Sequence, residues 1–362
     1  MDLTHSVTLG RSGLRVSPLC LGAMTFGTEW GIGVDAEPSM ALLDRYIGQG
    51  GNFIDTANMY NKGHSEAILG DYFAPGGRKG GKRDRIVLAT KWLGNMWPGD
   101  PNGGGGHRKA LLDSFDHSLR RLRTDYVDLL WMHFWDRWTP IDQTMRTLDD
   151  LVRAGKVRYI GFSDTPAWKC AQAQVMAEWR GWTPLVALQI EYSLLERTVE
   201  GELMPMAAEL GLGVTPWSPL KGGVLSGKYR KGQTPAGARQ REDSKHLSDK
   251  AYAVVDALDA IAKRHSCTVA QAALAWVRQQ AGVSSTIIGA RSMEQLDANI
   301  ASLAITLSPS DLATLDELSR PALNFPHDFL VMVRSNIQNG TTVNTVPSEL
   351  WKGAPQTDSE RW

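Results

Sequence analysis

Four side chains of this chain could together move a proton. Asp55, Lys91 and His133 stand at the ends of three successive short apolar runs, and Tyr60 follows Asp55 after five positions. A phenol has a reference pKa of about 10, so it is a poor acid near neutral pH unless a neighbouring charge stabilises its anion. The ammonium of Lys91 supplies such a charge, and the carboxylate of Asp55 would hold that ammonium in place.

These side chains are typical of carbonyl chemistry. We interpret Tyr60 as the proton donor to an oxygen that becomes an alkoxide, and His133 as the group that orients the carbonyl by a hydrogen bond. Each residue alone would more often be a helix cap, a core phenol or a hydrogen-bonded barrel residue, but four compatible residues at three strand ends favour catalysis. Because the set contains no nucleophile for the carbon, a cofactor is expected to supply the hydride.

Alternating apolar runs and amphipathic segments predict the elements that position these residues. A hairpin (Val7–Leu9 and Leu14–Val16) comes first. The predicted strands are Leu19–Gly22, Asn52–Asp55, Ile86–Thr90, Val127–Met132, Val157–Gly161, Leu185–Gln189, Gly213–Thr215 and Thr286–Gly289. The predicted helices are Ala36–Gly50, His64–Phe73, Arg108–Arg123, Ile141–Ala154, Pro166–Trp179, Glu202–Leu210, Asp249–His265 and Thr268–Gln279.

This alternation predicts the fold class. Parallel strands joined by right-handed crossovers in eight units close most simply into an α/β (β/α)8 barrel, with reactive groups where the strands end. A doubly wound open sheet is the alternative, but Leu21–Gly27 after the first strand lacks the Gly-rich fingerprint of that fold. We expect one domain over residues 1–362, with the barrel at about 17–320 and a C-terminal extension at 321–362 near the active-site face.

Two Gly-rich loops interrupt the repeat. Pro98–Gly106 follows the third strand, and Gly222–Ser248 follows the seventh. In a barrel, both loops would open onto the catalytic face.

Composition excludes several classes of protein. Lys and Arg together number 39, as do Asp and Glu, so no basic field favours nucleic acid or an anionic membrane surface. The three cysteines, Cys20, Cys170 and Cys267, form no CxxC pair, which argues for a reducing compartment and against a zinc site, and no metal is predicted. No apolar segment approaches the roughly 20 residues of a spanning helix. We therefore expect a cytoplasmic protein that binds a small-molecule substrate, and the oligomeric state stays open.

Seven segments resemble the aldo-keto reductase family, in the order that family shows. They are GGNFIDTANMY, ATKW, DLLWMH, LVRAGKVRYIGFSD, QIEYSLLER, PWSPLKGGVLSGKY and IIGARSMEQLDANI, and they span the chain to about residue 320. The loop after His133 is short, as in the bacterial and potassium-channel β-subunit branches. The resemblance implies a (β/α)8 barrel that binds NADP(H) without a Rossmann motif, with Tyr60 as general acid, Lys91 and Asp55 tuning it and His133 orienting the carbonyl.

The resemblance also implies a set of cofactor contacts. These are Asp55, Ser163, Asp164, Gln189 and Trp217 around the nicotinamide, Ser218, Leu220, Gly222 and Lys228 along the pyrophosphate, and Gly289, Arg291, Gln295 and Asn299 at the adenosine and its phosphate. Two positions depart from the family pattern. Asp164 stands where the family usually has Asn, and Ala298 replaces a common acidic residue near the adenine.

Large aromatic side chains just beyond the strand ends predict the substrate class. Phe26, Trp30, Trp92 and Trp135 are the predicted pocket residues, and Trp97, Phe134 and Trp138 belong to the same rim. Such a wall suits a ring-containing carbonyl compound, for example a sugar, steroid-like or mycotoxin-type ketone, although aromatic residues also stabilise long loops.

Two other functions stay open at this point. One is a redox-sensing subunit that retains its cofactor, similar to the channel β subunits, and the other is a Schiff-base lyase that uses Lys91.

Overall fold

The computed structural model describes residues 1–78, 82–231 and 244–361. The chain forms two units, Met1–Arg320 and Pro321–Trp362. The first unit contains an antiparallel hairpin of β1 (Val7–Thr8) and β2 (Arg15–Val16), as predicted, followed by the barrel.

Eight parallel strands form the barrel, in the spatial order β10-β3-β4-β5-β6-β7-β8-β9. Their bounds are β3 (Leu19–Gly22), β4 (Phe53–Asp55), β5 (Val87–Trp92), β6 (Val127–Met132), β7 (Val157–Ser163), β8 (Leu185–Glu191), β9 (Gly213–Trp217) and β10 (Thr286–Ile288). The two edges meet just before β10, where Val214 N donates to Gly282 O at 3.0 Å and Ser284 N donates to Val214 O at 2.8 Å. The predicted (β/α)8 barrel is therefore confirmed.

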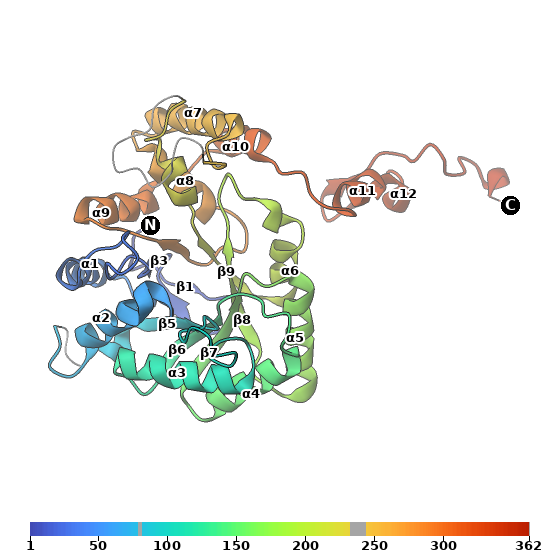
Figure 1. Cartoon of the computed structure of the whole chain (residues 1–362). Coiled ribbons are helices and arrows are strands. Elements are labelled where there is room, and N and C mark those ends of the chain that lie inside the picture. Colours follow the sequence, from blue (N-terminus) through green and yellow to red (C-terminus); the bar gives the residue numbers. More distant parts are fainter. Residues whose placement is uncertain (79–81, 232–243, 362) are drawn as a thin grey trace. The chain divides into compact units, whose positions relative to one another are not determined.

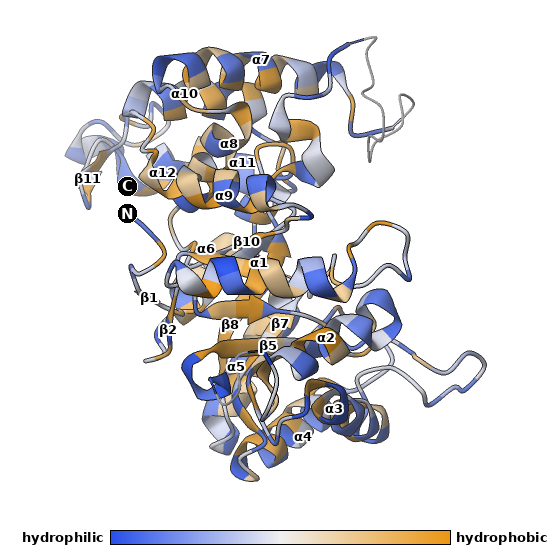
Figure 2. Cartoon of the chain, turned by 90° about the vertical axis from the view of Figure 1, so that its left-hand side faces the viewer, coloured by the Kyte–Doolittle hydropathy of each residue, from blue (hydrophilic) through white to orange (hydrophobic). Residues whose placement is uncertain are grey.

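Helices surround the strands, as Figure 1 shows. Their bounds are α1 (Ala36–Gly48), α2 (His64–Phe73), α3 (Arg108–Leu122), α4 (Ile141–Arg153), α5 (Ala167–Arg180), α6 (Leu203–Leu210), α7 (Asp249–Arg264), α8 (Val269–Arg278), α9 (Met293–Ala301) and α10 (Pro309–Ser319). The eight predicted helices agree with these bounds to within about two residues. Figure 2 shows the central strands as largely hydrophobic, whereas α1 alternates between hydrophobic and hydrophilic residues, as a helix that covers a sheet with one face should.

Several strands extend further toward the carboxyl end than the apolar runs predict. β5 continues to Trp92, β7 to Ser163, β8 to Glu191 and β9 to Trp217. The apolar run ends where polar side chains begin to face the barrel interior, but the backbone hydrogen bonds of the parallel ladder continue. Lys91 therefore lies within a strand, while His133 directly follows one, as predicted.

The N-terminal end of the barrel is filled by apolar side chains. Leu9 and Val16 of the hairpin pack in one buried cluster with Phe53, Leu129 and Trp131 from inside the barrel. The barrel is thus a packed core at this end, and its polar residues gather at the other.

The second unit has little regular structure. In its described residues it contains α11 (His327–Met332), α12 (Arg334–Gln338) and a short hairpin of β11 (Thr342–Val343) and β12 (Val346–Pro347). Its expected location near the active-site face stays a prediction. Residues 232–243 of the predicted loop Gly222–Ser248 lie outside the described residues. Among the described residues, no helix has the length and apolarity that crossing a membrane requires.

Candidate active site

Side-chain alternation brings the catalytic candidates to one face. Successive strand residues point to opposite sides, so Lys91 shares the barrel interior with Ala89, and Asp55 shares it with Phe53 two positions earlier. Trp131 of the same interior layer precedes His133 by two positions. The polar catalytic candidates therefore lie directly above the apolar side chains that fill the N-terminal end of the barrel.

Asp55 and Lys91 form a buried ion pair, with 2% and 1% of their surfaces exposed. Lys91 Nζ donates to Asp55 Oδ2 and, at 2.9 Å, to Thr56 O. Gln189 Nε2 donates to the other carboxylate oxygen, Oδ1, at 3.0 Å. Burial by itself would lower the pKa of Lys91, but the charges of Asp55 and Tyr60 and the hydrogen bonds to them raise it overall. Lys91 is therefore held as an ammonium.

Tyr60 lies between this ion pair and two other rings. Lys91 Nζ is 4.7 Å from the centre of the phenol ring, and the rings of His133 and Trp30 approach it edge-on with centroids 5.6 and 5.9 Å away. Burial raises the pKa of Tyr60, and the charge of Lys91 acts in the opposite direction. The predicted effect of Lys91 is present, but burial exceeds it. Tyr60 thus keeps its proton at neutral pH, which a proton donor requires.

His133 is neutral in this environment. Burial, followed by the charge of Lys91, lowers its pKa to about 3. Its Nδ1 is buried and has no hydrogen-bond partner among the described residues. A neutral imidazole carries one N–H, and it can therefore donate to a carbonyl oxygen without adding a proton.

Asn61 has no role in the sequence-based prediction, yet it connects the loop after β3 to the segment that carries the phenol. Its Nδ2 donates to Met24 O at 2.9 Å and to Phe26 O at 3.0 Å, and its Oδ1 accepts from Trp30 N at 3.0 Å. The residue is fully buried, and its φ of 45° lies in the left-handed region that Asn tolerates better than most residues. An Asn next to the proposed acid was the only signal available in the sequence.

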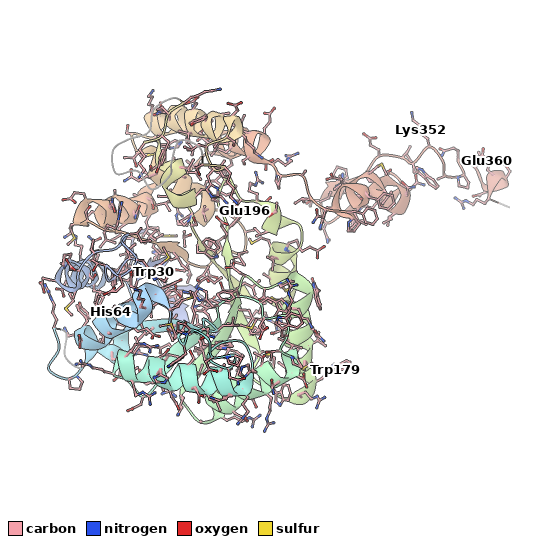
Figure 3. The ribbon with its side chains drawn as sticks, in the orientation of Figure 1. Trp30, His64, Trp179, Glu196, Lys352 and Glu360 are labelled. Atoms are coloured by element: carbon pink, nitrogen blue, oxygen red, sulfur yellow. The ribbon has the colours of Figure 1, made fainter. Side chains whose placement is uncertain are left out.

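A second contact holds the same loop. His64 at the start of α2 pairs with Glu29, with 3.0 Å between Nδ1 and Oε1. Figure 3 shows Trp30 and His64 on the same part of the barrel unit. The Trp30 loop is thus fixed against the segment that carries Tyr60.

Apart from Asp55 at the end of β4, the residues predicted around the nicotinamide lie at the carboxyl ends of β7, β8 and β9. Trp217 Nε1 donates to Asp164 Oδ1 at 3.0 Å, and Ser163 ends β7. Asp164 is exposed, yet desolvation by the surrounding protein raises the pKa of its carboxylate to about 6. The hydrogen bond from Trp217 acts in the opposite direction and lowers that pKa. The amide of Gln189 is committed to Asp55 on one side, so this residue joins the cofactor region to the ion pair.

The residues predicted along the pyrophosphate form a tight loop after β9. Gly222 N donates to Ser218 Oγ at 3.3 Å, and Gly222 has a φ of 62°. Leu220 lies between them in the same turn, and Lys228 is close enough that a Cβ on Gly223 would lie 3.4 Å from its Nζ. Close backbone and a lysine charge suit a phosphate.

The residues predicted at the adenosine phosphate meet at the start of α9. Arg291 N donates to Gln295 Oε1 at 2.9 Å, and Asn299 Nδ2 donates to Gly289 O at 3.1 Å. The Arg291 side chain is exposed, and a Cβ on Gly289 would meet nothing within 4 Å. A helix N-terminus, a free guanidinium and open space beside the backbone fit an anionic group. The donors present thus fit a phosphorylated dinucleotide.

Only part of the predicted aromatic wall faces outward. Phe26 and Trp92 are 0% and 1% exposed and pack in the core between strands and helices. Trp92 follows Lys91 in β5, so its side chain points to the opposite side of the strand. Trp30 and Trp135 are half-buried, and we retain these two as proposed substrate contacts.

Comparison with known proteins finds relatives over most of the chain. Residues 18–320 match the model of the aldo/keto reductase family. An aryl-alcohol dehydrogenase of Pestalotiopsis microspora is 37% identical over 334 residues, which cover 90% of this chain and 85% of that protein. The uncharacterized oxidoreductase YrpG of Bacillus subtilis is 39% identical over 327 residues, covering 88% and 96%. A norsolorinic acid reductase of Emericella nidulans is 37% identical over 337 residues, covering 90% and 84%.

Proposed function

The chain belongs to the aldo/keto reductase family, and we propose that it reduces ring-containing aldehydes or ketones to alcohols with NADPH, and runs the reverse oxidation. The observation that carries this proposal is the buried Lys91–Asp55 pair beside a protonated Tyr60 and a neutral His133. The name of the Pestalotiopsis microspora relative, an aryl-alcohol dehydrogenase, supports a ring-bearing substrate, and that of the norsolorinic acid reductase supports reduction.

NADP(H) would be held by the residues at the ends of β7, β8 and β9 and at the start of α9, and when bound it supplies the hydride. His133 donates a hydrogen bond to the carbonyl oxygen and so fixes its position against Tyr60. As negative charge develops on that oxygen, Tyr60 gives up its proton, and the adjacent Lys91 ammonium stabilises the resulting phenolate. Asp55 keeps Lys91 charged and in place.

The proposed preference for the 2′-phosphorylated cofactor rests on Arg291. Its guanidinium is exposed beside the N-terminus of α9, which Ser292 caps by accepting a hydrogen bond from Gln295 N at 3.3 Å. The positive charge of the guanidinium and the partial positive charge of the helix N-terminus both favour binding of an additional phosphate. Replacement of Arg291 by Ala should weaken NADPH binding by about 10-fold or more and leave NADH binding nearly unchanged.

Tyr60→Phe tests the chemistry. The variant should bind NADPH with unchanged affinity, measured by quenching of tryptophan fluorescence, and lose at least about 100-fold in kcat for aromatic aldehydes. Phe preserves the ring contacts with Trp30 and His133, so the loss would report the hydroxyl alone. Full activity in Tyr60→Phe would exclude Tyr60 as the acid.

The two alternatives have distinct outcomes. A Schiff-base mechanism needs a neutral amine, whereas Lys91 is held charged by Asp55, so borohydride with a carbonyl compound should leave Lys91 unmodified. A redox-sensing subunit would retain its nicotinamide cofactor through prolonged dialysis, whereas the proposed enzyme releases it.

A further inference from the structure

A groove opens beside the catalytic residues, between the loops that follow β5 and β6. Its volume is about 520 Å³, and its walls include Leu93, His107, Phe134, Trp135 and Trp138. We name it the distal groove. Phe134 joins it to the candidate active site, because the Phe134 ring lies 5.1 Å from the ring of His133. A substrate whose carbonyl meets His133 would have to pass Phe134 to reach the groove.

The only carboxylate that lines the distal groove, among the described residues, is already satisfied. Asp136 accepts hydrogen bonds from Gly106 N at 2.9 Å, Trp138 N at 2.9 Å and Thr139 Oγ1 at 2.6 Å. These bonds outweigh the effect of burial and lower the pKa of Asp136. The bond from Gly106 also ties the loop after β5 to the loop after β6, which constrains the shape of the groove.

Two hydrogen-bond donors that line the distal groove have no partner. The guanidinium of Arg137 is exposed and makes no ion pair or hydrogen bond with the described residues. His107 accepts a hydrogen bond from Ala110 N at Nδ1 (3.3 Å), which places the ring hydrogen on Nε2. That Nε2 is buried and lacks a partner within the described part of the chain. Both groups are suited to an anion.

Aromatic walls accompany these donors. Phe134 and Trp138 flank Arg137 in the loop, and 86% of the Trp138 surface is exposed. Rigid aromatic side chains favour a flat ring, and a guanidinium binds a carboxylate through two parallel hydrogen bonds.

We propose that the distal groove binds the remote end of an aromatic carbonyl substrate that carries a carboxylate, with Arg137 and His107 as donors to that carboxylate. The proposal rests on the proposed reductase function and specifies its substrate class. It makes Arg137 a specificity-determining residue rather than a catalytic one, because it acts on the end of the substrate away from the carbonyl.

Paired aldehydes test the proposal. We would measure kcat/KM for 2-naphthaldehyde and 6-formyl-2-naphthoate, and for benzaldehyde and 4-formylbenzoate, so that both length and charge vary. Arg137→Ala should lower kcat/KM for at least one carboxylated aldehyde by about 10- to 100-fold, mainly through KM, and change the neutral partner by less than about 2-fold. Arg137→Glu should lower it further, and Arg137→Lys should restore part of it.

The matched control is Arg85→Ala. Arg85 belongs to the 3-10 turn Arg83–Arg85, which precedes β5 at the amino end of that strand. Its replacement removes the same charge at the opposite end of the strand from the groove. Arg85→Ala should leave kcat/KM for all four aldehydes unchanged. An equal loss on charged and neutral aldehydes in Arg137→Ala, or no loss on either, would overturn the proposal.

Binding of 2-naphthoate separates the two proposals. This compound has no aldehyde or ketone group, so its quenching of tryptophan fluorescence reports binding without turnover, and the comparison with Arg137→Ala assigns that binding to the groove. Saturable binding to the native chain that weakens about 10-fold in Arg137→Ala supports the carboxylate site even if no aldehyde is reduced. If aldehydes are reduced but 2-naphthoate binds both proteins equally, the reductase function stands and the carboxylate site is refuted.

Discussion

Replacement of Asn61 by Ala should damage both stability and substrate binding. The change removes two donated hydrogen bonds, to Met24 O and Phe26 O, and one accepted from Trp30 N. Three backbone groups of the loop after β3 then lose a partner in a site from which water is excluded. Trp30, which contacts the ring of Tyr60, belongs to that loop.

The size of the effect follows from the contacts. Each lost hydrogen bond weakens folding by about 1 kcal/mol net, and each group that stays buried without a partner adds to this. Ala at a φ of 45° adds about 1 kcal/mol, which Gly would avoid. We expect Asn61→Ala to lower the free energy of unfolding by about 3 to 5 kcal/mol, and Asn61→Gly by about 1 kcal/mol less.

The assay combines urea unfolding with kinetics on 2-naphthaldehyde. KM should rise about 10-fold in Asn61→Ala, because a Trp30 loop that is no longer fixed must be ordered when substrate binds, and kcat should change less. Asn58→Ala is the matched control. Asn58 is equally buried but donates to Gly94 O and Ser114 Oγ, away from the Trp30 loop. It should lower stability by about 2 to 3 kcal/mol and leave KM within about 2-fold.

The reasoning would be refuted if Asn61→Ala unfolded at the same urea concentration as the native chain. It would also fail if Asn58→Ala and Asn61→Ala raised KM equally, because the effect would then be general loosening rather than loss of the link to Trp30.

Three further predictions concern charge and packing. Asp164 has a pKa of about 6, so its charged carboxylate is present above that pH and should favour the cationic oxidised nicotinamide. The affinity for NADP⁺, measured by fluorescence titration, should therefore fall as the pH drops from 7 to 5. Asp164→Asn should abolish this pH dependence. Asp311 completes the capping box of α10 by accepting hydrogen bonds from Ser308, and it also bonds to Arg264 and His265 at the end of α7. These bonds outweigh burial and lower the pKa of Asp311. A lowered folded-state pKa gives stability that is present above the unfolded value of about 3.9 and is lost as the pH falls through the folded value, so Asp311→Asn should reduce urea stability by about 2 to 3 kcal/mol at pH 7 and by less at pH 3. A Cβ on Gly161 would lie 2.4 Å from Trp131 inside the barrel, so Gly161→Ala should lower the Tm through about 1 to 3 kcal/mol of overpacking, whereas Gly13→Ala, which meets nothing within 4 Å, should not.

The differences between predicted and observed elements have a common cause. Apolar runs locate the centre of each strand, but they end where polar residues begin to line the mouth, and so β5 and β9 proved longer than their runs. The predicted substrate wall is wrong at Phe26 and Trp92, because both side chains are buried in the core. Both are aromatic residues near strand ends, and nothing local distinguishes a side chain that faces the mouth from one that packs under a helix.

The sequence by itself determined the barrel and the gathering of Asp55, Lys91 and His133, because both depend on local periodicity: strands alternate with helices, and every second strand residue faces inward. It also indicated Tyr60, which lies within reach of the same point.

Only the tertiary structure decided how these residues are tuned and what surrounds them. The bond from Gln189 to Asp55 joins positions 134 residues apart, and the pKa of Tyr60 depends on burial that no sequence pattern reports. Arg137 lacks a partner within the described part of the chain because Asp136, the carboxylate beside it, already accepts three hydrogen bonds. Distances across the barrel and exclusion of water arise from packing of the whole chain, so they cannot be inferred from any one segment.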